Sequence, residues 1–208
     1  MPVHQLVRRS VPTVVVALAL VGALSACSTP ATSPPTSSGI PSTVPSSFPT
    51  EVSPPGDVPD TQAYVVFTSA DHTYSIKVPE GWAQSTKAGA TTFTDKLNSI
   101  AIASSSSAAA PTVSSVRSAT VPNIAASVPK FALGTIAAFK RPGGSGVMVT
   151  YLDDSPPSAV TGSVVRNAVE LFVFWKNGKR VSVTLTSPQG ADNVDPWNIV
   201  TRSFAWLG

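Results

Sequence analysis

The stretch VRNAVELFVFWKNGKRVSVTLTS, residues 165–187, decides the fold. Asn177-Gly178 separates two runs of β-branched and aromatic residues, which is the strongest short-range signal for a hairpin with a two-residue loop. Such a loop places Lys176 opposite Lys179. One face of the hairpin then carries apolar residues and is predicted to lie in the core: Phe172, Phe174, Val181, Val183 and Leu185.

The opposite face of this hairpin is only half apolar. It carries four apolar residues, Val169, Leu171, Val173 and Trp175, which lie across from Thr186, Thr184, Ser182 and Arg180. We expect another element to cover this face, because a half-apolar sheet face is unstable in water. The C-terminal segment is the candidate, with Asp195 as N-cap, Pro196 at the first helical position, and three apolar residues at helical spacing: Trp197, Val200 and Phe204. Trp175 and Arg180 face each other and are predicted to form a cation–π pair.

Shorter patterns on both sides of the hairpin complete the expected domain, residues 61–208. Strands are predicted at 64–68, 72–78, 91–95, 99–104, 133–140 and 147–152, the last two joined by a Gly-rich turn at 143–146. Val121, Ile124 and Val128 form a short helical stripe that ends at Pro129. Strands joined by hairpins, with helices between and after them, predict an α+β fold in which an antiparallel sheet packs between helices.

The first 27 residues have the pattern of an export signal. Arg8 and Arg9 precede residues 11–26, which are almost wholly apolar or small. This run is shorter than the roughly 20 residues that span a bilayer, and it fits a signal peptide. Residues 24–27, Leu-Ser-Ala-Cys, resemble a bacterial lipobox, which implies cleavage after residue 26 and lipid attachment to Cys27. The alternative is a plain secretory signal followed by a coincidental cysteine.

Residues 27–60 are predicted to be a lipidated cysteine followed by a disordered linker. Of residues 28–60, nine are Pro, eight are Ser and five are Thr, and aliphatic residues occur only singly. Such a composition buries too little apolar surface to offset the entropy of ordering. The linker is interpreted as a tether through a cell wall, with a passive leader as the alternative. Its Ala/Pro/Ser/Thr-rich style looks actinobacterial.

Residues 67–68 and 74–82, FT and YSIKVPEGW, resemble the opening hairpin of PsbP-like and DcrB-like domains, and Ser203-Phe204 resembles their closing helix. The resemblance extends over about 140 residues in layout, and only the strand-turn motif is specific. It implies an antiparallel sheet between helices, with Tyr74 and Ile76 in the core and Trp82 capping the sheet. It implies no catalytic residues, and the family includes photosystem accessory proteins and bacterial envelope lipoproteins.

The charges and rare residues exclude several functions. The chain has 14 Lys and Arg against 11 Asp and Glu, and removal of Arg8 and Arg9 leaves it near +1, so a basic nucleic-acid surface is not expected. One cysteine excludes an internal disulfide and a Cys-based zinc cluster. His72 is predicted to be an exposed turn residue and not a catalytic base, because the sequence has no Gly-x-Ser-x-Gly nucleophile motif.

Two further groups of charged residues are candidate sites. The acidic residues 192–195 and 153–154 do not match a calcium-loop spacing, and helix capping and loop roles are preferred. Lys176, Lys179 and Arg180 form a basic hairpin tip, either a solvated turn or a contact for anionic lipid or polymer. No metal or cofactor is therefore expected.

The sequence predicts a non-catalytic lipoprotein, anchored by Cys27 to the extracytoplasmic side of the cell membrane, that binds another envelope protein. The expected binding surface is Leu171, Val173, Trp175 and Arg180. The alternative is a carrier of a small apolar ligand, which requires a cavity beside Val169, Leu171, Val173 and Trp175. A hydrolase is the least favoured reading.

Overall fold

The structure is a computed structural model, and it describes residues 54–208. The predicted signal peptide, Cys27 and most of the predicted linker lie outside the described residues. Among residues 54–208, no helix combines the length and apolar character needed to cross a bilayer.

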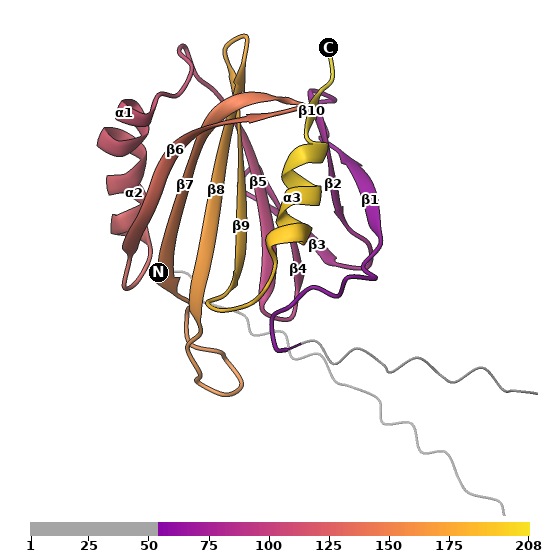
Figure 1. Ribbon diagram of the computed structural model, residues 1–208, viewed down its shortest axis with the longest axis vertical. Coiled ribbons are helices and arrows are strands. Elements are labelled where there is room, and N and C mark those ends of the chain that lie inside the picture. The colour runs from indigo at the N-terminus through magenta and orange to yellow at the C-terminus, as the bar shows by residue number, and fades with distance from the viewer. Residues whose placement is uncertain (1–53) are drawn as a thin grey trace, which may run out of the picture. The chain divides into compact units, whose positions relative to one another are not determined.

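A seven-stranded antiparallel sheet forms the centre of the described part (Figure 1). Its strand order is β3 (Ala83–Lys87), β4 (Ala90–Asp95), β5 (Asn98–Ser106), β9 (Lys179–Pro188), β8 (Arg166–Lys176), β7 (Gly144–Asp154) and β6 (Ala132–Arg141). The predicted register of the β8–β9 hairpin is confirmed, since Lys176 pairs with Lys179 and Phe174 with Val181. Asn177 and Gly178 both have positive φ, +47° and +80°, as a type I′ turn requires.

A second sheet of three strands contains β1 (Tyr64–Thr68), β2 (Tyr74–Pro79) and β10 (Ala205–Trp206). The alternation in β2 buries Tyr74, Ile76 and Val78, as the sequence predicts. Strand β10 follows the C-terminal helix and pairs with the start of β2. Phe204, between that helix and β10, is 1 % exposed and stacks on Phe174 with ring centroids 4.0 Å apart.

One face of the seven-stranded sheet, the first face, lies against helix α3 (Val194–Ser203) and the small sheet (Figure 1). Its core contains the predicted core residues of the hairpin together with the apolar side of α3: Phe172, Phe174, Val181, Val183, Leu185, Trp197, Val200 and Phe204. Trp82 packs edge-to-face on Trp197, with ring centroids 6.4 Å apart. The α+β prediction is confirmed.

The opposite, second face is covered by a different helical segment. This segment is continuous through α1 (Val113–Ser115), a π-helical turn η1 (Val116–Thr120) and α2 (Val121–Ser127). It begins with a capping box in which Thr112 Oγ1 accepts from the Ser115 N–H and Ser115 Oγ from the Thr112 N–H. Its apolar residues pack on the face that carries Val169, Leu171 and Val173.

Two sequence predictions are wrong in detail, and one strand was not predicted. The C-terminal helix packs on the aromatic first face, not on the half-apolar second face. Its N-cap is Asn193 rather than Asp195, since the Trp197 N–H donates to the Asn193 carbonyl in the first turn. The Asn193 side chain bonds to Val58 and Gly56 and makes no cap hydrogen bond. Strand β3 was not predicted because all five of its residues are exposed and show no alternation; pairing with β4 alone holds it in the sheet.

The folded part also begins before residue 61. Val58 is 5 % exposed, and its N–H donates to Asn193 Oδ1 at 2.7 Å. Asn193 Nδ2 donates to the Gly56 carbonyl at 2.8 Å. The linker assignment up to residue 60 therefore misplaces residues 54–60, because one buried valine among prolines leaves no periodic signal.

Candidate functional site

The predicted binding surface lies mostly beneath the helical segment. Leu171 is 7 % exposed and Val173 3 % exposed, and both pack in the second-face core. Trp175 and Arg180 lie half-buried beyond the end of that core and are paired in register. Of the four predicted residues, only these two are accessible to a partner while the helices stay in place.

Trp175 and Arg180 do not form the predicted cation–π pair. The Trp175 indole N–H donates to the Ser107 carbonyl at 2.9 Å, and Arg180 Nε donates to Ser105 Oγ at 3.2 Å. Both side chains are thus turned toward the segment that follows β5. The cation–π contact found in the described residues is instead Arg141 over Phe172, with Cζ 5.6 Å from the ring centroid.

Small hollows lie along the margin between the helical segment and the sheet. One of about 490 Å³ is lined by Trp175, Pro111 and Gly146, among others. A second, of about 260 Å³, is lined by Val173, Arg180 and Val116, among others. Beside Leu171 and Val169, however, Val116, Val121 and Ile124 occupy the space that a ligand cavity would need.

The first face is incompletely covered over strands β6, β7 and β8, beside α3 (Figure 1). We call this region the open strip and define it by five half-buried residues: Met148, Thr150, Leu152, Ala168 and Glu170. At its lower end is a hollow of about 250 Å³, to which the edge-strand residues Ala132, Leu133 and Gly134 contribute. Leu133 is 39 % exposed and pairs with Tyr151, so it adds apolar surface on the edge strand beside the strip.

A β-bulge shapes this lower end. The β6–β7 register shifts between Leu133 and Ile136, and a bulge leaves a backbone group without its ladder partner. Thr150 Oγ1 accepts the Thr135 N–H at 2.8 Å. Gly134 permits this close approach, because a Cβ there would lie 2.5 Å from Thr150 Oγ1. The wall of the hollow is therefore fixed by Gly134 and Thr150 together.

Glu170 places a carboxylate among the apolar groups of the open strip. Burial raises its pKa, and the positive charge of Arg141 opposes that rise. Within the described residues, no hydrogen bond or ion pair holds this carboxylate. An interior-facing carboxylate without a partner is costly to desolvate further, unless an incoming group provides a donor.

Arg141 lies half-buried between β6 and α3. Its Nη2 donates to Asn198 Oδ1 at 3.2 Å, and its Nε is buried without a partner in the described residues. Burial and the nearby Arg202 lower its pKa, while Glu170 raises it. Glu170 within the strip and Arg141 beside it thus place one acidic and one basic group next to apolar side chains.

Sequence reasoning missed the open strip, although the signal was present. The register that places Phe172 and Phe174 on the core face also places Glu170 there. A charged residue at a core-facing position of a strand indicates that the sheet is uncovered at that point. The apolar residues of that face predict a core but do not show where its cover ends.

The other predicted residues have structural roles. His72 is exposed, with φ +53° in the turn before β2. Asp154 pairs with Arg166 at 3.0 Å, and Asp153 accepts from Asn167 Nδ2 at 2.9 Å. Asp192 lies before α3 and Asp195 in its first turn. No group of three or more His, Cys, Asp or Glu residues within 54–208 is arranged to hold a metal ion.

The chain matches no protein-family profile and no curated protein sequence. Its fold is similar to solved structures of low sequence identity. The solution structure of cyanobacterial PsbP (CyanoP) from Synechocystis sp. PCC 6803 has a TM-score of 0.50 and 15% identity, covering 73% of this chain and 98% of that one. The Ran-binding protein Mog1p of Saccharomyces cerevisiae has a TM-score of 0.47 and 7% identity, covering 71% and 97%. The likeness to CyanoP confirms the PsbP-like fold.

Proposed function

We propose that this protein is a lipid-anchored protein on the extracytoplasmic side of the cell membrane, whose domain is a non-catalytic module that binds another envelope protein. The anchor is inferred from residues 24–27, Leu-Ser-Ala-Cys, after a charged and apolar leader. A diacylated Cys27 would hold the chain firmly, because each buried CH₂ contributes about 0.8 kcal/mol. The PsbP-like fold is compatible with an accessory role.

The open strip carries the binding proposal. The second face is covered by α1–α2, and the rest of the first face by α3 and the small sheet. Among the described residues, Met148, Thr150, Leu152, Ala168 and Glu170 form a contiguous half-buried part of that core face. A partner that supplies apolar side chains and a donor to Glu170 would complete this burial, which moves the expected binding surface from the second face to the first.

The carrier hypothesis is less well supported. The hollows of the described part measure about 250 to 490 Å³, which reaches only the lower part of the roughly 300–1,000 Å³ range of small-molecule sites. The cavity that it requires beside Leu171 is occupied by side chains of the helical segment. The hollow beside Trp175 is the remaining place for a small apolar ligand.

Site-specific crosslinking in the native envelope tests the binding role. A photoreactive residue at Leu152, in the open strip, should capture a discrete envelope protein. The matched control position is Thr86 on β3, which is exposed on the opposite edge of the same sheet. Leu152→Arg should abolish the capture, whereas Thr86→Arg should leave it unchanged. Equal capture at both positions, or capture only beside Trp175, would contradict the proposed surface.

Fractionation tests the anchor separately. Cys27→Ala should leave the chain either unprocessed or released from membranes, because no thiol remains for lipid attachment. A Cys27→Ala protein that stays membrane-bound with its leader removed would contradict the lipobox assignment.

A further inference from the structure

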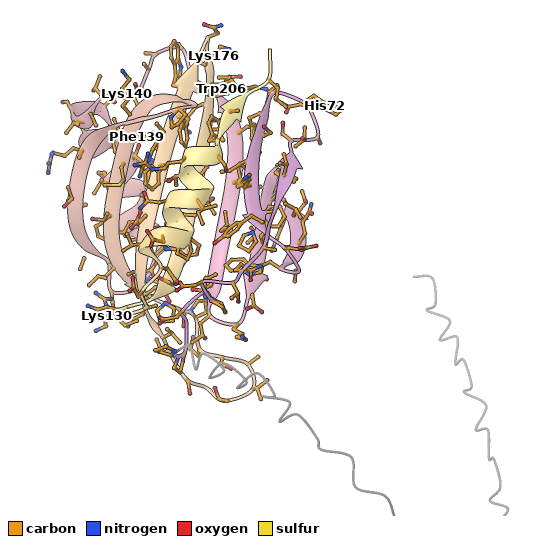
Figure 2. The ribbon with its side chains drawn as sticks, turned by 45° about the vertical axis from the view of Figure 1, so that its right-hand side comes forward. His72, Lys130, Phe139, Lys140, Lys176 and Trp206 are labelled. Atoms are coloured by element: carbon orange, nitrogen blue, oxygen red, sulfur yellow. The ribbon has the colours of Figure 1, made fainter. Side chains whose placement is uncertain are left out.

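One end of the domain gathers turns that are far apart in sequence. The Ser107 N–H donates to the Gly178 carbonyl, the Leu207 N–H donates to the Thr73 carbonyl, and Lys176 Nζ donates to the Gly208 carbonyl. The β6–β7 turn lies there too, because a Cβ on Gly143 would overlap the Phe204 carbonyl. Figure 2 shows Lys140, Lys176, Trp206 and His72 toward this end and Lys130 at the other.

This end is strongly basic. Its strand ends, hairpin turns and the last turn of α3 contribute six cations: Lys140, Arg141, Lys176, Lys179, Arg180 and Arg202. The one acidic side chain among these turns is Asp71, which accepts a hydrogen bond from Lys179 Nζ. We call this the basic end. It extends the basic hairpin tip seen in the sequence by three cations that the fold brings in from β6 and α3.

The opposite end is acidic. The loops and element ends there contain eight carboxylates: Asp57, Asp60, Glu80, Asp95, Asp153, Asp154, Asp192 and Asp195. They are placed together by contacts such as Asp192 N–H to Asp57 Oδ1, Asn193 Nδ2 to Asn98 Oδ1, and Glu80 N–H to the Ala63 carbonyl. Three cations, Lys96, Lys130 and Arg166, lie at this acidic end, and two of them pair with Asp95 and Asp154.

The described chain also starts at the acidic end, where Gly56 and Val58 contact Asn193. The net charge of the domain is therefore nearly balanced, but its cations and carboxylates lie at opposite ends of the strands. The β8 strand, 11 residues long, sets the separation at roughly 35 Å. This is several Debye lengths at physiological salt, so each end acts on its surroundings independently of the other.

We propose that the basic end docks on the anionic lipid headgroups of the membrane to which the protein is anchored, an inference that rests on the membrane location proposed above. Residues 28–53 could span about 80 Å as an extended chain at roughly 3.1 Å per residue. The chain is therefore long enough to let the domain turn its basic end toward the bilayer, while the acidic end faces away from it. Each Lys or Arg near an anionic surface strengthens the attraction about fivefold.

Vesicle flotation tests the docking without the lipid anchor. The chain from residue 27 onward, carrying Cys27→Ser, is mixed with vesicles of phosphatidylglycerol and phosphatidylcholine or of phosphatidylcholine alone. We expect flotation with the anionic vesicles only, and loss of it as the salt concentration rises.

Two charge-reversal pairs form the matched comparison. Lys140→Glu with Lys176→Glu, at the basic end, should weaken partition at least about 25-fold, on the basis of about fivefold per cation. Lys96→Glu with Lys130→Glu changes the net charge equally at the acidic end and should change partition less than about threefold. Melting curves establish that both variants fold.

Two results would overturn the proposal: no flotation of the unsubstituted chain with anionic vesicles at low salt, or equal weakening by both pairs. Retention of the same chain on immobilised polyphosphate without flotation would assign the basic end to an acidic polymer and also overturn docking on lipid. The protein-binding role is tested separately by crosslinking at Leu152, so the two proposals can fail independently.

Discussion

The two faces of the seven-stranded sheet are covered by helices of very different composition. On the first face, α3 and the small sheet bring Trp197, Phe204 and Tyr74 against Phe172 and Phe174. On the second face, an Ala/Ser-rich helical segment brings valines and one isoleucine against a mainly valine surface. Bulky aromatic groups need equally deep neighbours to fill the space between the layers, whereas small aliphatic groups pack on a shallow, β-branched face. Side-chain size, rather than order along the chain, therefore pairs each helix with its face.

Truncation of the aromatic anchor of α3 should have the largest effect on stability. Trp197→Ala should cost about 3–5 kcal/mol of unfolding free energy, because Trp197 is 5 % exposed and its removal leaves a large cavity beside Trp82. Urea denaturation measures this change. The control is Ile199→Ala on the exposed side of the same helix, which should change stability by less than about 0.5 kcal/mol. Similar effects of the two substitutions would mean that α3 does not hold the first face.

Removal of the residues before 61 should also lower the unfolding free energy, because these residues contact the start of α3 on the first face. The truncation exposes the site of Val58 and leaves buried Asn193 without its contacts to Val58 and Gly56. We expect a loss of about 2–3 kcal/mol, since the burial of Val58 and two hydrogen bonds of Asn193 are lost, while the bond from Asn193 Nδ2 to Asn98 Oδ1 remains. Melting of chains that begin at residue 54 and at residue 61 decides this. Equal melting temperatures would show that residues 54–60 contribute nothing to the docking of α3.

Truncation of a single side chain on the second face should lower the unfolding free energy less than Trp197→Ala does. Val116→Ala removes a side chain that is 2 % exposed and should cost about 1.5–2 kcal/mol, at about 0.8 kcal/mol per buried methylene. Val113→Ala, at the margin of the same helical segment, is the control and should cost less. If Val116→Ala and Trp197→Ala lowered the unfolding free energy equally, the expected energetic difference between the two faces would be contradicted.

The smallest effect should come from Glu170 in the open strip, and it should depend on pH. Burial raises the folded-state pKa of Glu170 above its unfolded value. The contribution of Glu170 to folding stability is therefore most favourable below its unfolded-state pKa, and it is lost as the pH rises through its folded-state pKa. Glu170→Gln should raise the urea midpoint near pH 7 and change it little near pH 4. Thr150→Ser, on the neighbouring strand, should show no such pH dependence.

An opposite pH response is expected at the basic end. Hydrogen bonds from Lys179, Ser69 and Thr73 hold the pKa of the exposed Asp71 well below its usual range. Asp71 therefore favours the folded state above its unfolded pKa, and this support fades as the pH falls toward the folded pKa. Screening by solvent keeps the effect small, so the two carboxylates differ in the sign of their pH dependence as well as in their surroundings.

The local elements were readable from sequence because their signals are local. Asn177-Gly178 specified the hairpin and its register, and the alternation of Tyr74, Ile76 and Val78 specified the buried side of β2. Strand β3 was not readable, because five exposed residues carry no burial pattern and only the pairing with β4 defines them. Val58 was not readable either, because its partner Asn193 is 135 residues away.

The sequence by itself determined the α+β class, the hairpin register and the two helices, since each depends on turn chemistry and on periodicity within a short segment. It also supplied the apolar N-terminal segment and Cys27, from which the leader and the anchor are proposed. Only the tertiary structure decided which helix covers which face, where α3 is held by Asn193, and where the sheet stays open. Those features depend on side-chain volumes and hydrogen bonds between distant residues. The separation of six cations from eight carboxylates has the same origin, because no stretch of sequence shows which turns meet at one end of a sheet.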